Sequence, residues 1–172
     1  MDGLMNGGYI LYVRHAEANV GVDLPGFSFG NCLTQRNLSN NGRMQAMMFG
    51  EYLRHKSIPI AYPILASPFC RAIETANLAF GAENVQISPF LIQLYRLSGV
   101  LSEFERESIL NTLEGMLETK PSFRNNQVII GHNFPKGVGL GDIPDMGTVV
   151  VESRGRGRGY NIVARISLNQ WM

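Results

Sequence analysis

The sequence predicts an α/β fold built around a mostly parallel sheet. Three short apolar runs, at residues 9–13, 63–66 and 127–130, have the composition of strands buried on both faces. Segments with the pattern of amphipathic helices separate these runs, and such alternation of strand and helix is typical of parallel pairing. Polar residues that include histidine, arginine and serine follow each run directly or after one glycine.

Length and composition predict a single globular domain over residues 1–172. Of the 172 residues, 45% are hydrophobic and 17% are charged, which is ordinary for a soluble protein with a sizeable core. The formal net charge of +1 gives no general attraction to nucleic acid or membranes, so an anion site has to be local. No run approaches the ~18 apolar residues that span a bilayer, and residues 1–8 lack signal-peptide features. We expect a cytoplasmic protein without nucleic-acid or membrane partners; its oligomeric state stays open.

The N-terminal part of the chain predicts a strand, a long loop and a helix. The strand at residues 9–13 ends in an arginine and a histidine. The loop at residues 18–35 contains glycines, a proline and two phenylalanines, so we expect it to pack down as a binding loop or lid. Ser39 is a good N-cap for a helix that continues to about residue 56. Three of its methionines are predicted to fill the core, namely Met44, Met47 and Met48.

The second strand, at residues 63–66, leads into a helix that carries an arginine in its first turn. Ser67 is expected to be the N-cap and Pro68 the first helical residue, and Gly81 marks the end. Arg71 then lies where free backbone N–H groups and the helix dipole favour anions. Because a cation is unfavourable there for stability alone, the position favours a functional anion partner for Arg71.

The C-terminal part predicts a loop-like stretch, a helix and three further strands. A short strand at residues 85–87 precedes the loop-like stretch, and a capping box formed by Ser102 and Glu105 starts the helix. The strand at residues 127–130 ends in Gly131 and His132. The remaining features are a closing strand pair at residues 148–151 and 160–166, a basic hairpin loop at Arg154 to Gly159, and Trp171 as an anchor of the tail.

The two cysteines, Cys32 and Cys70, allow one pairing. Two free thiols in a reducing cytosol are the default prediction. A disulfide is the alternative if the loop that holds Cys32 folds over Cys70, since the sequence does not supply the separation of the two Cα atoms.

Four side chains that follow the predicted parallel strands are candidates for one anion site: Arg14, His15, Arg71 and His132. The carboxyl ends of parallel strands share one edge of a sheet, where ligands bind. The planar guanidinium of arginine matches phosphate oxygens, and an imidazole can attack phosphorus and carry the phosphoryl group. Such a cluster neutralises the spread charge of phosphoryl transfer. No residues with metal-ligand spacing occur elsewhere, so we expect no metal and no other cofactor.

Four motifs, in this order, resemble the motif series of the histidine phosphatase superfamily, in its phosphoglycerate mutase-like branch. They are Arg14-His15-Ala16-Glu17, Leu38 to Ala46, Ser67 to Ala76, and Gly131-His132. The resemblance implies a three-layer α/β/α sandwich with a mostly parallel central sheet. It implies that His15 is the phosphorylated nucleophile and that Arg14, Arg71 and His132 complete the phosphate pocket. The short chain looks more like the small phosphatases than a full mutase.

The sequence departs from the family where a proton donor is expected. Many relatives have a glutamate in the segment that here contains Gln93, and the phytase-like branch has an aspartate where this chain has Asn133. An amide cannot donate a proton as a carboxylic acid does. The general acid is therefore unassigned, and three carboxyl groups are candidates by loop position alone: Glu103, Asp142 and Asp145.

We therefore expect a metal-independent phosphatase that hydrolyses phosphomonoesters or phosphohistidine through His15. Its partner would be a small phosphorylated substrate or a phosphohistidine protein. A general acid contributes about 10²–10⁴ in rate, so without one the enzyme would be restricted to good leaving groups. A mutase-type transferase and a catalytically weak phosphate-binding or regulatory protein are the alternatives. Arg36 is interpreted either as a ligand of a substrate anion or as a surface residue.

Overall fold

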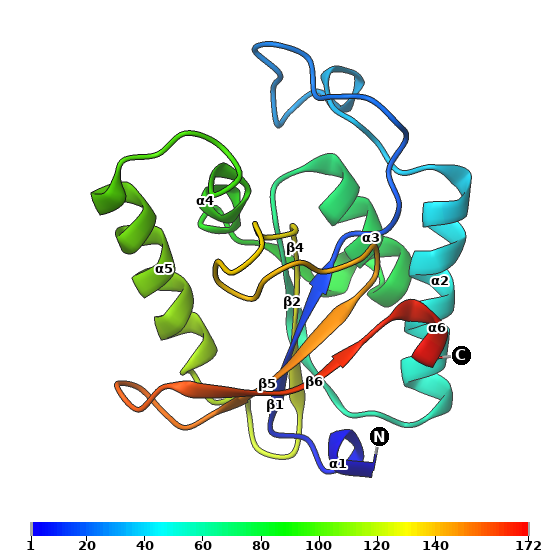
Figure 1. The fold of residues 1–172 in the computed structure, drawn as a ribbon. Coiled ribbons are helices and arrows are strands. Elements are labelled where there is room, and N and C mark those ends of the chain that lie inside the picture. The colour runs from blue at the N-terminus through cyan, green and yellow to red at the C-terminus, as the bar shows by residue number, and fades with distance from the viewer. Residues whose placement is uncertain (1, 172) are drawn as a thin grey trace.

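The computed structural model describes residues 2–171, which form a six-stranded sheet with helices on both faces (Figure 1). The strand order is β3-β2-β4-β1-β5-β6. The first four strands are parallel, β5 is antiparallel to β1, and β6 is antiparallel to β5. The predicted α/β/α sandwich with a mostly parallel sheet is confirmed. The strands are β1 (Tyr9–Arg14), β2 (Ile60–Ala66), β3 (Val85–Ile87), β4 (Asn126–Gly131), β5 (Thr148–Ser153) and β6 (Tyr160–Ile166).

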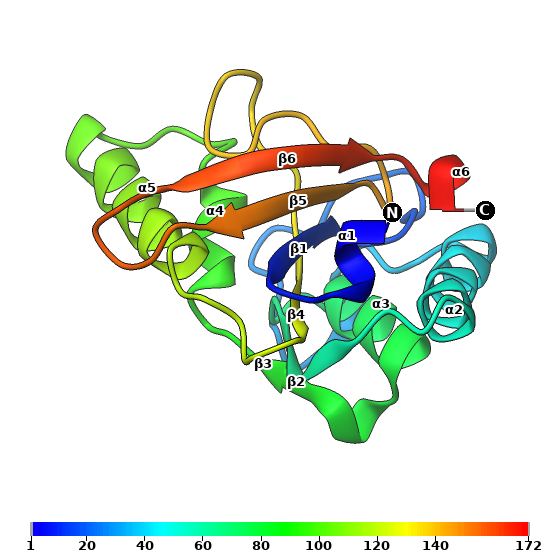
Figure 2. The same ribbon diagram turned by 90° about the horizontal axis from the view of Figure 1, so that it is seen from below.

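The helices lie in two layers, with α4 and α5 on one side of the sheet and α2, α3 and α6 on the other (Figure 2). Their bounds are α1 (Asp2–Met5), α2 (Asn40–His55), α3 (Cys70–Phe80), α4 (Leu91–Arg96), α5 (Glu103–Leu117) and α6 (Leu168–Trp171), with short 3-10 turns η1 (Cys32–Thr34) and η2 (Ala82–Asn84).

Alternate residues of the central strand β1 face two separate apolar cores. Leu11 and Val13 belong to the core shared with α2 and α3, whereas Ile10 and Tyr12 belong to the core shared with α4 and α5. All four side chains are 0–1% exposed. A strand covered on both faces needs an unbroken apolar run, because its side chains alternate between the faces. This burial fixes β1, and therefore the two residues at its carboxyl end.

Helix α2 packs against α3 through small residues, and the prediction that its methionines fill the core is wrong. Met44, Met47 and Met48 are 53%, 41% and 43% exposed. The helix is close enough to α3 that a Cβ atom added to Gly50 would lie 2.1 Å from the carbonyl oxygen of Ala79. The buried face is therefore narrower than the apolar pattern of the sequence indicates.

Two further local predictions are corrected. The loop-like stretch before residue 102 contains α4, whose N-cap residue, Phe90, makes no side-chain cap bond. The helix is held by burial of Leu91 and Leu94 and not by a capping signal. Helix α3 begins at Cys70 and not at Pro68, and its N-cap is Phe69 and not Ser67. The hydroxyl of Ser67 instead contacts His132.

The closing part of the chain follows the predictions. The Trp171 side chain is 1% exposed, packs edge-on against Phe49, and donates its indole N–H to Thr148 at 3.3 Å. The loop between β5 and β6 is a hairpin whose Gly157 and Gly159 amides donate to the Glu118 carboxylate at 2.6 and 2.7 Å.

Gly50→Ala tests the close packing of α2 on α3. We expect the free energy of unfolding to fall by about 2 kcal/mol or more, because the added methyl group overpacks a buried contact. Gly115→Ala in α5 is the matched control, since a Cβ there meets nothing within 4 Å; it should stabilise the protein by about 0.5–1 kcal/mol. Urea unfolding measures both variants, and equal effects would contradict the packing.

Candidate active site

The carboxyl ends of β1, β2 and β4 lie at one edge of the sheet, beneath the loop at residues 18–35 (Figure 1). Arg14 is opposite Gly131 in the parallel β1–β4 ladder, so His15 and His132 leave the sheet side by side. Their ring centroids are 5.5 Å apart. Parallel register thus brings together two histidines that are far apart in the sequence.

The ring of His15 is held in one tautomer. Its Nδ1 lies 2.7 Å from the Ala16 carbonyl oxygen, and its Nε2 lies 3.2 Å from Nε of Arg71. A carbonyl accepts and a guanidinium donates, so Nδ1 carries the proton and Nε2 presents a lone pair. Burial lowers the pKa of His15 to about 3; the Ala16 carbonyl opposes the shift, and nearby arginine charges add to it. His15 is therefore neutral at pH 7.

His132 is fixed by Tyr12 and Ser67. The hydroxyl of Tyr12 donates to the His132 carbonyl and accepts from its amide, both at 3.0 Å. This contact needs glycine at position 131, where a Cβ would lie 2.2 Å from that hydroxyl. Ser67 Oγ lies 2.8 Å from Nε2 of His132. Burial, together with the repulsion that a second charged imidazole at His15 and the nearby arginine charges would exert, keeps the pKa of His132 well below its ordinary value. If Ser67 donates to Nε2, Nδ1 carries the proton and is free to bind an anion.

Arg71 is the buried cation of the site. Its side chain is 2% exposed and lies over the ring of Phe69, 4.4 Å from the centroid. Thr75 ties this part of α3 to β1, because its hydroxyl donates to the Arg71 carbonyl at 2.7 Å and accepts from the Ala16 amide at 3.0 Å. The Arg71 guanidinium is thus held beside the lone pair of His15.

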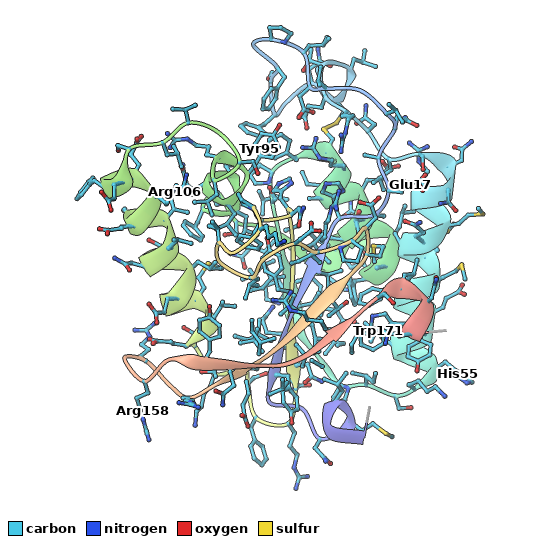
Figure 3. All side chains as sticks on the ribbon, viewed as in Figure 1. Glu17, His55, Tyr95, Arg106, Arg158 and Trp171 are labelled. Carbon is cyan, nitrogen blue, oxygen red and sulfur yellow. A yellow bond between two sulfur atoms is a disulfide. The ribbon has the colours of Figure 1, made fainter. Side chains whose placement is uncertain are left out.

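Arg14 is the last residue of β1, directly before His15. It donates to the Ile143 carbonyl at 2.8 Å and pairs with Asp145 at 2.9 Å. Glu17, by contrast, is structural: its carboxylate accepts from the Ser39 hydroxyl at 2.6 Å and from the Asn41 amide at 2.8 Å. Figure 3 shows Glu17 beside the start of α2, away from Tyr95.

Asp23 is a site residue that the sequence analysis missed. Its carboxylate makes a two-point ion pair with Arg71, at 2.9 and 3.3 Å, and accepts from the Arg36 amide at 2.8 Å and the Tyr95 hydroxyl at 3.2 Å. Burial raises the pKa of Asp23, but these partners outweigh burial and keep the pKa below its ordinary value. The ionised carboxylate therefore binds the two terminal nitrogens of the Arg71 guanidinium.

The prediction of two free thiols is wrong, since Cys32 and Cys70 form a disulfide with Cα atoms 5.7 Å apart. That distance suits a bridge. The aromatic rings of Phe27 and Phe29 also pack on Phe69, with centroids 5.2 and 5.1 Å away. The loop at residues 18–35 is therefore fastened to the start of α3, as the alternative interpretation of the cysteines required.

A cavity of about 230 Å³ opens between this loop, α4 and the rim of the sheet. Three buried nitrogens in its lining residues have no hydrogen-bond partner among the described residues: Nε of Arg14, Nε of Arg36 and Nδ1 of His132. Buried donors normally find acceptors, so the cavity suits a ligand rich in acceptor oxygens. Arg36 belongs to this lining, which favours the anion-ligand interpretation. The lining residues are Arg14, His15, Gly21, Val22, Asp23, Arg36, Arg71, Tyr95, Ser98, His132 and Asn133.

None of the three predicted acid candidates lies in the described lining of this cavity. Asp145 pairs with Arg14, and Asp142 accepts from the Asn133 amide at 2.7 Å. Glu103 is exposed at the start of α5. Within residues 2–171, no group of three or more His, Cys, Asp or Glu side chains is arranged to hold a metal ion.

Residues 10–92 match the family model described as histidine phosphatase superfamily, branch 1. The resemblance that the motifs predict is confirmed over these residues. His132 lies outside the matched range, and its place beside His15 comes from the structure. A search of curated protein sequences gives no match.

Solved structures share the fold across nearly the whole chain. The protein histidine phosphatase SixA complexed with tungstate is 15% identical, with a TM-score of 0.63 and coverage of 95% of this chain and 99% of SixA. Phosphoserine phosphatase from Entamoeba histolytica, with 3-phosphoglyceric acid, is 15% identical, with a TM-score of 0.58 and coverage of 95% and 99%. Ecdysone phosphate phosphatase from Bombix mori, with tungstate, is 15% identical, with a TM-score of 0.52 and coverage of 91% and 92%.

Neutral, buried His15 predicts a dependence of stability on pH. Between the pKa of a histidine in the unfolded chain, ~6.5, and its native pKa of about 3, the unfolded chain binds a proton that the native protein does not. The free energy of unfolding should therefore fall as pH decreases through this window, by up to about 1.4 kcal/mol per pH unit for this group. Urea unfolding between pH 7 and pH 5, without phosphate, should show a smaller slope for His15→Asn. Identical slopes would contradict the assignment.

We expect removal of the disulfide to lower the stability of the protein. Cys32→Ser/Cys70→Ser opens a link between residues 38 positions apart, and we expect the free energy of unfolding to fall by about 2–4 kcal/mol. Thermal unfolding with and without reductant measures the effect. Reductant should lower the melting temperature of the wild type and leave that of the double variant unchanged; a wild type insensitive to reductant throughout unfolding would disprove the bridge.

Proposed function

We propose that this protein is a metal-independent phosphatase that hydrolyses phosphomonoesters or phosphohistidine through a phosphohistidine intermediate on His15. The observation that supports it best is the state of His15. A neutral imidazole presents its Nε2 lone pair beside a cavity that also contains three arginines and a second histidine. This combination of a nucleophile with a cationic pocket suits attack on a phosphoryl group.

In the first step, Nε2 of His15 attacks phosphorus, and the bond from phosphorus to the leaving oxygen breaks. The ring becomes positively charged as the P–N bond forms. The Ala16 carbonyl, 2.7 Å from Nδ1, stabilises that charge by accepting the Nδ1 proton in a hydrogen bond. Water then attacks phosphorus, the P–N bond breaks, and inorganic phosphate leaves.

The arginines and His132 hold the phosphoryl oxygens during both steps. In the free protein Nε of Arg71 donates to the His15 lone pair; when Nε2 bonds to phosphorus, this N–H turns to a phosphoryl oxygen. Nε of Arg14 and Nδ1 of His132 are buried without partners and supply further donors. Fixed donors of this kind stabilise the charge that spreads over the oxygens in the transition state.

The alternatives are a mutase-type transferase and a weak phosphate-binding or regulatory protein. The similar structures named above are described as phosphatases of phosphohistidine proteins, phosphoserine and ecdysone phosphate, which favours hydrolysis over transfer. The cavity of about 230 Å³ suits a phosphoryl group with a small part of its carrier. The proposed partner is accordingly a small phosphorylated substrate or a phosphohistidine protein.

The location of the protein is part of the proposal. No helix among residues 2–171 combines the length and the apolar character needed to cross a membrane. The cytoplasmic prediction rests on the lack of signal-peptide features at residues 1–8, and the disulfide between Cys32 and Cys70 argues against it. A persistent disulfide favours an oxidising compartment, and we propose one for this protein.

The intermediate is tested by trapping. Incubation with a radiolabelled phosphodonor and rapid denaturation should yield one acid-labile phosphohistidine per chain, and His15→Ala should abolish both labelling and turnover of p-nitrophenyl phosphate. His55→Ala is the matched control, because this exposed histidine lies at the end of α2, and Figure 3 shows it on the opposite side of the molecule from Tyr95, which lines the cavity. Wild-type turnover in His15→Ala would refute the nucleophile, and labelling without turnover would favour the weak phosphate-binding alternative.

A further inference from the structure

One carboxyl group lies in the described lining of the cavity, that of Asp23. Its side chain is 8% exposed, and every polar partner it has also lines the cavity: Arg71, Arg36 and Tyr95. The residues expected to provide an acid by analogy with the family are amides here, and the three candidate carboxyl groups lie elsewhere. The cavity therefore contains one group that can exchange a proton as a carboxylic acid does.

The guanidinium of Arg71 places Asp23 and His15 at opposite edges of one planar group. Nε of Arg71 faces His15, and the two terminal nitrogens face the Asp23 carboxylate. A phosphoryl group bound along this guanidinium has its attacked side toward His15. In-line displacement puts the leaving oxygen on the side away from Nε2, which is the side of the loop that carries Asp23.

We propose that Asp23 is the general acid and base of the reaction, an assignment that rests on the proposed function and specifies it further. In the first step, the carboxylic acid of Asp23 gives its proton to the leaving oxygen while the P–O bond breaks and the P–N bond forms on His15. In the second step, the carboxylate takes a proton from the water that attacks phosphorus, and the P–N bond breaks. Each turnover returns Asp23 and His15 to their starting states.

Substrate binding explains how an ionised carboxylate gains the proton. In the free protein, Asp23 faces the positive charges of Arg71 and Arg36 and the hydroxyl of Tyr95, which favour the carboxylate. A phosphate that takes the N–H groups of Arg71 removes the ion pair and brings negative charge close to Asp23. Both changes favour the carboxylic acid, which forms when the carboxylate takes up a proton from bulk water. Across the cavity, Arg14, His15 and His132 face the phosphate as well.

The loop that carries Asp23 is held in place for this role. The disulfide joins Cys32 to Cys70, the residue before Arg71, and the Gln35 side chain accepts from the Cys70 amide at 2.9 Å. Asp23 therefore stays near the cavity when the phosphate replaces it on Arg71.

The test compares leaving groups in Asp23→Asn. For an alkyl phosphate such as phosphoserine, protonation of the leaving oxygen is essential, and kcat/KM should fall by about 10²–10⁴. For p-nitrophenyl phosphate, whose leaving group is stable as an anion, kcat/KM should fall no more than about tenfold. In the wild type, the pH profile of kcat for the alkyl substrate, which reports groups in the enzyme–substrate complex, should also show a basic limb that Asp23→Asn lacks. Glu103 is an exposed carboxyl group outside the cavity, so Glu103→Gln should leave kcat/KM unchanged for both substrates.

Two outcomes would overturn the proposal. An equal fall for both substrates would show that Asp23 only positions Arg71, and tighter binding of inorganic phosphate with an unchanged difference between substrates would show that Asp23 is merely a competing anion. Asp23→Glu, which keeps the acid, should recover part of the alkyl activity and guards against a folding defect. If the radiolabelled phosphodonor did not label His15 in the wild type, the proposed function itself would be overturned. The two failures are therefore distinguishable.

Discussion

A buried guanidinium needs partners, and this need connects the distant parts of the site. Arg71 is 2% exposed, and a charge taken out of water is tolerated only when it is paired and hydrogen-bonded. Its partners come from separate segments: the imidazole of His15 after β1, the carboxylate of Asp23 in the following loop, and the ring of Phe69 before α3. The loop therefore covers the edge of the sheet with a carboxylate directed inward.

The sequence predicts the frame of the site well because that frame depends on local signals. Apolar runs without polar interruption identify β1 and β4, and parallel pairing then brings His15 and His132 together without knowledge of any side-chain contact. The cap at Ser39 also depends on neighbouring residues, and it is found where expected. These features combine residue type with a fixed period or offset, which is the information that a single sequence carries.

Features that depend on pairing across long sequence separations could not be predicted with the same success. Asp23 and Arg71 are 48 positions apart, and no periodicity marks an aspartate in a glycine-rich loop. A signal was nevertheless present: a bridge between Cys32 and Cys70 would bring Asp23, the one acidic residue of the loop at residues 18–35, over Arg71. Ser67 was misassigned for a related reason, because its hydroxyl suits a helix cap and a histidine partner equally well, and tertiary structure decided between them.

The attachment of this loop has an evolutionary consequence. The segment before Cys32 follows β1 and is joined covalently to α3 at Cys70, so both of its ends are held by the scaffold. Amino acids of this segment, such as Val20 and Val22, are largely exposed and contribute little to the core. Such exposed residues can change during evolution without disturbing the core or the attachment at Cys70.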